Sequence, residues 1–445
     1  MGLATDADFN NASRYLSMKI ELYFNGLESA PLTVTKDDYL VDTDWLEEGS
    51  AESSNPFGTI SSNELSFRLF NKDGMFSPTN TSGAYFGLIK SGVCIIPYIK
   101  PINAADDLEW IKLGVYYVTG WTAAITSIYA EVVANDKWQT ILNSSAPNYK
   151  VERNVTFKEA YDNVFNLMGF DVTVDEALTQ LLVYSFTEGT PQNFLQELAK
   201  GSLVYCTSDK NGVPTVNPFI ATRSVRATLT DGDQIKSVES KQSIIKAYDG
   251  VELTYSIPQG ITQSKLVELQ DISIMSGESL LPYLAFDIGP LWQINSVTIH
   301  NPTEAIQLTR YVATPWLISL YLNNPNAASV LATILVYGTT VGFTDVVLSD
   351  EGTKILKVAS RYIQTAEYAA VYKTVLNAFV NSTIPLLTVS VRGNPLLNIG
   401  DRISIQSTRY NLIFDGVIQR MKYAYNGSLS CEMTLLNNSV IQGVS

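Results

Sequence analysis

The sequence contains few of the residues on which most enzymes and metal sites depend. His300 is the only histidine, and three cysteines (Cys94, Cys206 and Cys431) lie far apart without a C-x-x-C pair. This spacing indicates neither a disulfide framework nor a zinc site. Because no G-x-S-x-G motif accompanies the single histidine, a serine hydrolase is not predicted either, and we expect His300 to be structural.

Basic residues are also scarce. The sequence has 44 acidic and 30 basic residues, which gives a formal net charge of −14. A protein that grips nucleic acid needs a basic surface to bind phosphates, so this class is disfavoured. The composition is compatible with a surface past which DNA slides without adhering.

Long apolar runs are absent. The most apolar stretch, residues 330–347, is interrupted by Tyr337, two glycines and further polar residues, and a membrane-spanning helix needs roughly 18 apolar residues or more. The N-terminal segment has no basic region followed by an apolar one, so it is not typical of a signal peptide. We therefore expect a protein without membrane anchoring that is made in the cytoplasm.

Motifs for metal ions and phosphates are incomplete. Residues 71–74 (NKDG) and 231–233 (DGD) contain acids that could bind Ca²⁺, but neither continues with the spacing or the closing glutamate of an EF-hand. Both are typical of turns. No G-x-x-x-x-G-K-[ST] motif is present. The sequence predicts neither a metal ion nor a cofactor.

Carboxylates are frequent, but no pattern pairs them. Glycoside hydrolysis needs two carboxylates at a defined separation, and the candidates are scattered over the chain: Glu64, Asp136, Glu252, Asp287 and Asp401. With 44 acidic residues, some pairs arise by chance. We assign no catalytic residue and predict that the protein is not an enzyme; a glycan hydrolase is the less favoured alternative.

The first part of the chain has the pattern of short strands. Apolar and polar residues alternate in five segments punctuated by Gly, Pro, Asn and Asp: residues 18–26, 63–74, 92–101, 113–124 and 127–138. Short strands at this spacing indicate a barrel or a sandwich. We place a first β-domain at residues 1–148.

Helical signals begin after that domain. Thr156 followed by Glu159 is a capping box, and Gly169 predicts the end of this helix. A second helix is predicted from the cap Thr190 to Gly201, with proline at its first position. A hairpin that turns at residues 209–212 follows. We assign residues 149–245 to an α+β insert.

The rest of the chain returns to strands and then to a helix. Residues 246–350 are strand-rich and predict a second β-domain. Apolar residues at helical spacing over residues 352–381 predict a helix of about 25 residues, or ~37 Å. A hairpin turning at Asn426-Gly427 follows. Residues 351–445 are therefore read as a long helix plus a C-terminal β-barrel.

A corner rich in special residues separates two alternating segments within SVRGNPLLNIGDRISIQS, residues 390–407. Proline fixes φ and glycine permits an unusual φ, so architecture is a sufficient reason for it. Arg392 and Asp401 could pair across the corner, although a solvated pair contributes little. The structural corner comprises Arg392, Gly393, Asn394, Pro395, Gly400 and Asp401.

Two segments share a pattern that suggests an internal repeat. Gly92 and Gly400 each lead into an alternating strand, and Gly114-Val115 opens a later strand as Gly416-Val417 does. If the repeat is real, the chain carries two related β-barrels near its ends, with the middle domains inserted between them. Any two hairpins share some of this pattern, so the alternative stays open.

The order of these segments resembles that of phage tail-tip and baseplate hub proteins. RGNPLLNIGDRISI after a long helix is similar to their C-terminal barrel, and residues 61–142 look like their N-terminal barrel. Residues 159–218 resemble their helical insert, and residues 250–294 their next β-domain. The resemblance covers nearly the whole chain in order, while each motif is weak by itself. It implies a mainly β, multidomain fold with two related hub β-barrels and inserted α+β and β domains.

This resemblance also implies a function. In that family a homotrimer supplies six barrels, matches a six-fold tail tube to a three-fold tip and forms part of the DNA ejection channel. The implied partners are tail tube or distal tail proteins on one side, spike or fibre proteins on the other, and DNA that passes without specific binding. The implied location is the tail tip of the virion. Because the barrel is followed directly by Ser445, we expect any lytic domain on another chain. The alternative is a receptor-binding adhesin.

Overall fold

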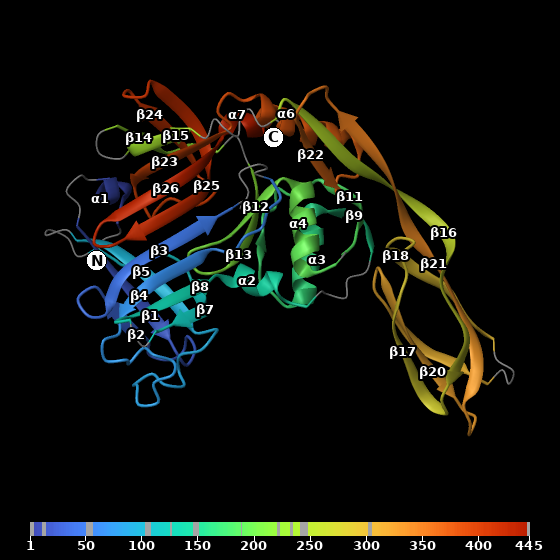
Figure 1. Ribbon diagram of the computed structural model, residues 1–445. Coiled ribbons are helices and arrows are strands. Elements are labelled where there is room, and N and C mark those ends of the chain that lie inside the picture. Colours follow the sequence, from blue (N-terminus) through green and yellow to red (C-terminus); the bar gives the residue numbers. More distant parts are fainter. Residues whose placement is uncertain are drawn as a thin grey trace.

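The structure, a computed structural model, is mainly β, with 52% of residues in strands and 14% in helices, as predicted. It describes residues 4–10, 15–49, 57–102, 108–124, 127–145, 151–187, 189–219, 223–231, 235–240, 248–300 and 305–442. Strands from the two ends of the chain lie side by side, with the insert beside them and a long arm extending away (Figure 1).

One sheet of 14 strands contains strands from both ends of the chain. Those of the first half are β1 (Tyr15–Tyr23), β2 (Leu32–Thr35), β3 (Leu40–Glu48), β4 (Glu64–Phe70), β5 (Cys94–Ile102), β6 (Ile111–Lys112), β7 (Tyr116–Thr122) and β8 (Tyr129–Asn135). Those of the second half are β14 (Val225–Thr230), β15 (Ile235–Ser240), β23 (Leu386–Arg392), β24 (Arg402–Ser407), β25 (Leu412–Tyr425) and β26 (Leu429–Asn437). The main path runs β15-β23-β26-β25-β3-β4-β8-β7-β5-β1-β2.

The insert has a core of its own and contains the predicted capping box. Its elements are α2 (Lys137–Leu142), β9 (Glu152–Thr156), α3 (Phe157–Met168), β10 (Thr173–Val174), β11 (Leu181–Ser185), α4 (Pro191–Ser202), β12 (Val204–Ser208) and β13 (Pro214–Pro218). Thr156 and Glu159 bond each other's backbone reciprocally, and Gly169 ends α3 at a φ of 73°. The predicted turn at residues 209–212 joins β12 to β13.

The predicted end of α4 at Gly201 is wrong. The helix continues to Ser202, and Leu203 takes the left-handed conformation that closes it, with a φ of 53°. A side chain at Gly201 would place its Cβ 2.6 Å from the Cβ of Tyr362. The glycine therefore permits close packing, which a local helix-stop rule does not detect.

The arm is a long hairpin with its own core. Its elements are β16 (Gly250–Ile274), β17 (Gly277–Ala285), β18 (Leu291–His300), β19 (Gln307–Ala313), β20 (Leu317–Asn324) and β21 (Val330–Ser349). Most of β16 pairs with β21, and β18 lies on the other side of β21. β17, β20 and β19 form a second small sheet that packs over the apolar residues of the first.

The long helix predicted over residues 352–381 is wrong in its first half. Residues 355–360 form β22 (Ile355–Ser360), which runs parallel to β16. Only α6 (Ala366–Asn381) is helical, and it begins at the cap Thr365. Leu356, Val358 and Ser360 are buried at every second position, so the strand period applies here.

The largest hydrophobic core contains residues from both ends of the chain, from α6 and from the base of the arm. Separate cores lie in the insert and in the outer arm. The predicted domain limits stay predictions, since the first and last segments share one core. None of the described helices combines the length and the apolar character needed to span a bilayer.

Replacing Gly201 tests the packing role assigned to it. We expect Gly201→Ala to lower the free energy of unfolding by about 1–3 kcal/mol, because the new methyl group overpacks the contact with Tyr362. Gln192→Ala at an exposed position of α4 is the control, with an expected change within about 0.5 kcal/mol. Urea denaturation measures both. Equal stability of the two variants would contradict the packing role.

Candidate functional site

The two halves of the large sheet have the same strand order. The first half reads β3-β4-β8-β7-β5-β1, and the second reads β15-β23-β26-β25-β24-β14. The connections agree as well, because a short helix follows the strand that comes last along the chain in each half, α2 after β8 and α7 (Asn438–Ile441) after β26. One difference is that β1 runs antiparallel to β5, whereas β14 runs parallel to β24.

Irregularities of the ladders occur at matching places in the two halves. The shifts lie between Leu40 and Asp42 in β3 and Ile235 and Ser237 in β15, and between Val118 and Gly120 in β7 and Ile418 and Arg420 in β25. A bulge re-aims a strand and pins its register. These bulges make the halves equivalent residue by residue, with Leu40 matching Ile235 and Val118 matching Ile418.

The predicted match of Gly92 with Gly400 agrees with this equivalence. Both glycines have positive φ, +84° and +86°. The N–H of Gly92 donates to the carbonyl of Val118, and that of Gly400 donates to the carbonyl of Ile418, each at 2.8 Å. Val118 and Ile418 donate back to the residue after each glycine, at 2.9 Å. The second predicted match is displaced by two residues, because Gly416 corresponds to Tyr116 and not to Gly114.

The halves are joined by pairing of β25 with β3, which we call the internal joint. Its ladder runs from Arg420 opposite Glu48 to Tyr425 opposite Thr43. Trp45 and Tyr423 stack across it with ring centroids 4.5 Å apart and an interplanar angle of 13°. Such a pair contributes about 0.5–1.5 kcal/mol beyond its buried area. The internal joint therefore makes one continuous sheet of the two halves.

The predicted corner is anchored from several sides. Asn394 is 2% exposed, and its side chain donates to Asp6 at 2.8 Å and accepts from the N–H of Leu396 at 3.0 Å. The hydroxyl of Tyr423 donates to its carbonyl at 2.9 Å. The corner thus ties α1 (Asp6–Asn10) and the internal joint together.

The corner also receives the hairpin of the insert. Lys210, in the turn between β12 and β13, donates to the carbonyl of Pro395. A Cβ at Gly393 would lie 2.8 Å from Leu429, and a Cβ at Gly400 would overlap the Tyr205 hydroxyl. Both glycines are therefore needed for close approach.

The predicted pairing of Arg392 with Asp401 is wrong. Asp401 instead accepts the N–H of Asn398 at 2.9 Å, and the cations that act on its carboxyl are Arg226, Arg223 and Lys210. The Nη1 of Arg392 is buried without a hydrogen-bond partner among the described residues. Arg392 is the last residue of β23.

A polar cavity of about 330 Å³ lies where the two halves meet the insert; we call it the junction cavity. Two of the five scattered acids come together here, since both Asp136 and Asp401 line it, with Glu47 and Lys210 beside them. The other three lie elsewhere, Glu64 in β4, Glu252 in β16 and Asp287 between β17 and β18. No group of three metal-ligating side chains occurs in the described part of the chain.

Burial shifts the pKa of the charged groups in the junction cavity. It raises the pKa of the Glu47 carboxyl to about 7, against a weaker opposing effect of Lys210. It raises the pKa of Asp136 to about 7 although the N–H of Trp138 donates to this carboxylate at 3.0 Å. It also lowers the pKa of Lys210. Both acids are therefore close to half protonated at neutral pH.

Sequence reasoning missed Glu47 and Lys210, because the walls of the junction cavity come from distant segments. One signal was available for Glu47. It follows the inward-facing Thr43 and Trp45 at every second position of β3, where an apolar residue is expected. No local signal marks Lys210, which lies in an ordinary hairpin turn.

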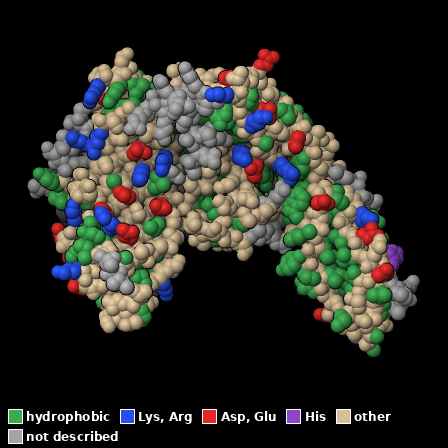
Figure 2. All heavy atoms as spheres, viewed as in Figure 1, with side chains coloured by type: hydrophobic (Ala, Val, Ile, Leu, Met, Phe, Trp, Pro, Cys, Tyr) green, Lys and Arg blue, Asp and Glu red, His purple; other side chains and the backbone are tan. Residues whose placement is uncertain are grey.

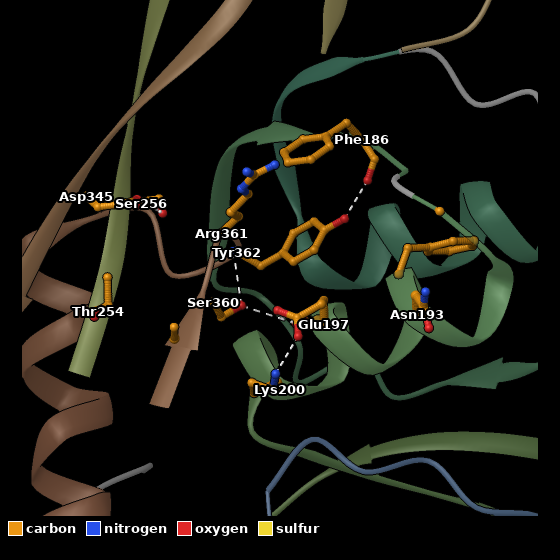
Figure 3. A pocket seen from close by; sticks show the side chains of 13 residues that line it. Phe186, Asn193, Glu197, Lys200, Thr254, Ser256, Asp345, Ser360, Arg361 and Tyr362 are labelled. Atoms are coloured by element: carbon orange, nitrogen blue, oxygen red, sulfur yellow. Dashed lines mark hydrogen bonds and ion pairs between the residues drawn. The ribbon is translucent and has the colours of Figure 1, made fainter. Parts of the chain in front are cut away.

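A larger cleft of about 720 Å³ separates α4 from the base of the arm (Figure 3). Its polar groups bond to their neighbours within the chain. Tyr362 donates to the carbonyl of Phe186 at 2.6 Å, Ser360 to that of Glu197 at 3.3 Å, and Ser256 to Asp345 at 2.6 Å. The first two bonds tie the insert to the base of the arm and the third lies within the arm, so the cleft is a structural seam.

The remaining motifs form turns, as predicted where they are described. The N–H of Gly74 donates to the carbonyl of Asn71 at 3.0 Å. Asp231 accepts from the Ser407 hydroxyl at 2.7 Å and from the Arg409 N–H at 2.9 Å, while residues 232 and 233 lie outside the described residues. His300 is exposed at the end of β18.

The junction cavity makes stability depend on pH. The pKa values of Glu47 and Asp136 are higher in the folded protein than in the unfolded chain. Their contribution to the free energy of unfolding is therefore complete below about pH 4 and is lost as the pH rises to 7. We expect the free energy of unfolding to fall by at least about 2 kcal/mol between pH 5.5 and 8.5. Asp136→Asn, which keeps a capping side chain, should flatten this slope. A slope unchanged in the variant would contradict the assignment.

The two equivalent glycines provide a matched pair of substitutions. Gly92→Ala should cost about 1–2 kcal/mol, because only backbone strain is added and the space around it is open. Gly400→Ala should cost clearly more, since its Cβ also overlaps the Tyr205 hydroxyl. Thermal or urea unfolding compares them. Equal losses would show that the corner does not approach Tyr205 closely.

Comparisons with known proteins give a likeness of fold. No protein-family model and no curated protein matches the sequence. Among solved structures, the 43 kDa tail protein of prophage MuSo2 from Shewanella oneidensis aligns with 96% of this chain and 100% of its own, with a TM-score of 0.52 and 13% identity. The tail protein from Neisseria meningitidis MC58 aligns with 96% and 98%, with a TM-score of 0.53 and 9% identity. Over nearly its whole length, this chain has the fold of phage tail proteins.

Proposed function

We propose that the chain is a structural virion protein, a hub at the tip or baseplate of a phage tail. Three copies form a ring that matches a six-fold tail tube to a three-fold tip and surrounds part of the DNA ejection channel. The observation that carries this proposal is the duplication of the sheet within one chain, with equal strand order and bulges in both halves. The likeness of fold to phage tail proteins supports it.

Two similar halves per chain allow a trimer to match a six-fold neighbour. A trimer with one barrel-like half per chain presents three equivalent surfaces, whereas a trimer with two similar halves presents six. A six-fold neighbour can then contact every half in nearly the same way. The insert and the arm occur once per chain, so they supply contacts with three-fold symmetry. In this proposal the tail tube or distal tail proteins bind the sheet, and spike or fibre proteins bind the single-copy parts.

Net charge supports a channel that does not hold DNA. The formal net charge is −14, and repulsion between like charges keeps DNA from adhering to a wall. No cluster of metal-ligating side chains occurs among the described residues. We therefore propose no catalytic activity and no cofactor.

A receptor-binding adhesin is the second candidate, because the arm exposes aromatic and apolar side chains. Hydrophobic residues gather over the arm in Figure 2. Among them, Tyr283 is 76% exposed, Met275 68% and Tyr311 46%. Aromatic side chains with a polar tip suit binding surfaces. Binding of saccharides to the isolated chain would favour this candidate over a purely structural hub.

The mass of the purified chain in solution tests the hub. We expect light scattering to give a particle near three times 49.0 kDa, and negative-stain class averages to give a ring with six similar densities. A monomer at all accessible concentrations would contradict the trimer. A trimer without a ring would contradict the role of the duplicated halves.

A further inference from the structure

The two small sheets of the arm leave one side open between them. Among the described strands, β18 pairs only with β21 and β19 pairs only with β20. The N–H of Leu291 donates to the carbonyl of Pro315 at 2.7 Å and joins the two sheets at one end of this side. Next to that bond, a groove of about 430 Å³ lies between residues 291–294 and residues 311–314; we call it the seam groove.

One side chain in the seam groove is exposed where burial is expected. Tyr311 lies opposite Leu320 in the ladder, so both side chains leave the sheet on the same face. Leu320 belongs to the core between the two sheets and is 0% exposed, whereas Tyr311 is 46% exposed. Side chains on the inner faces of packed sheets form the core. Tyr311 is exposed because no strand lies beside β19 to cover it.

The spacing of packed sheets leaves room for one strand in this place. Packed sheets lie about 10 Å apart, and paired strands lie about 4.8 Å apart. A strand placed midway between β18 and β19 is therefore at pairing distance from both edges. Because the N–H of Thr314 donates to the carbonyl of Leu317 at 2.8 Å, the alternation of the ladder directs the N–H and C=O groups of Tyr311 and Ala313 away from β20.

The strands on the two sides of the arm differ in how their edges are protected. Free edges are normally blocked against pairing by lysine, by proline or by other charged residues. On one side, β16 carries Lys265 and Glu268, and β17 contains Pro282. On the side of the seam groove, β18 and β19 contain no lysine, no proline and no acidic residue. Only this side is open to an added strand.

The chemistry of the seam groove indicates what kind of strand fits. Leu291, Ile294 and Ala313 belong to the outer core of the arm or pack against it, so the floor is apolar. Arg153 lies beside the groove, with its guanidinium carbon 4.8 Å from the ring centre of Trp292, and Arg310 precedes Tyr311 in β19. These cations have no acidic neighbour in β18 or β19. The groove therefore suits apolar residues that alternate with acidic ones.

We propose that the seam groove binds an extended acidic segment of another protein as an added strand between β18 and β19. Main-chain bonds to both edges hold the segment, and the apolar floor selects every second side chain. The added strand joins the two small sheets into one, in the order β16-β21-β18-segment-β19-β20-β17. The proposal goes beyond the proposed function, because it concerns the arm of a single copy and does not require a trimer.

Selection from a library of random heptapeptides on the immobilised full chain tests the proposal. We expect the enriched peptides to alternate apolar and acidic residues. Fluorescence anisotropy of a labelled enriched peptide then gives the Kd for the chain and its variants. Ala313→Pro should raise this Kd at least about tenfold, because it removes a donor from the free edge. Ala313→Ser keeps the N–H and is the matched control, with a Kd within about twofold of the original.

Arg310→Gln tests the preference for acidic residues. We expect this exposed substitution to raise the Kd of the acidic peptide about fivefold, as loss of a solvated ion pair does. A peptide with the same apolar residues and glutamine in place of its acids should bind both forms equally. Equal binding of the acidic peptide by both forms would overturn the assignment of the charge.

Hydrogen exchange of the unmodified chain locates the peptide without any substitution. Binding should slow exchange at Tyr311 and Ala313, whose N–H groups point to the free edge. Exchange at Val312 should change little, because its N–H faces Ser319 in the ladder. Urea denaturation shows whether Ala313→Pro remains folded, as expected for proline at an edge position.

Three results would overturn the proposal. One is a selection that enriches no peptide. Another is an enriched peptide that Ala313→Pro binds as tightly as the unmodified chain, or that protects amides outside residues 292–294 and 311–313. The third is self-association of the chain that Ala313→Pro abolishes, since the occupant of the groove would then be a second copy.

Discussion

Backbone pairing between β3 and β25 is the contact on which the rest of this structure depends. It joins residues nearly 380 positions apart in sequence, Glu47 opposite Met421 among them, and it makes one sheet from the two halves. Bringing such distant segments together costs chain entropy that grows only slowly with loop length. The ladder bonds and the Trp45–Tyr423 stack offset that cost at one place. The corner, the insert and α1 all attach next to this contact.

The insert is held against the internal joint by polar contacts that are costly to bury. Lys210 reaches the carbonyl of Pro395, and Glu47 and Asp136 share its cavity. Burying a charge is unfavourable unless it is paired or neutralised, and the raised pKa values of both acids mean that they are largely neutralised at mildly acidic pH. The contact is therefore specific in geometry and modest in strength.

How much the sequence predicts depends on the range of the interactions. The capping box at Thr156 and the turn at Asn426-Gly427 are complete within a few residues, and both are found as predicted. The predictions for Gly201 and for residues 355–360 are wrong because both depend on distant parts of the chain. Gly201 packs against Tyr362, and residues 355–360 pair with the parallel strand β16. Two glycines in the sequence suggest the internal repeat. The residue-by-residue match of the two halves follows only from the bulges, and a bulge is visible only once two strands are paired. The junction cavity could not be predicted, since its walls come from segments spread along the chain from Glu47 to Asp401.

The two halves share their strands but differ in the loops that connect them, which six identical subunits could not do. In the first half, residues 71–93 connect β4 to β5, whereas the matching connection from β23 to β24 is the short corner at residues 393–401. The corner is short because it must pack under the Lys210 turn and the Tyr205 ring. The first half meets no such restriction and can extend a longer loop of successive turns. Duplication within one chain thus keeps the strand framework, where the bulges and the Gly92 and Gly400 bonds are equal, while each half acquires its own contacts. Identical subunits could not do this, because any change would appear six times around the proposed ring. The proposed hub, which would present six similar sheets and three distinct sets of contacts, is therefore well served by two linked and divergent halves.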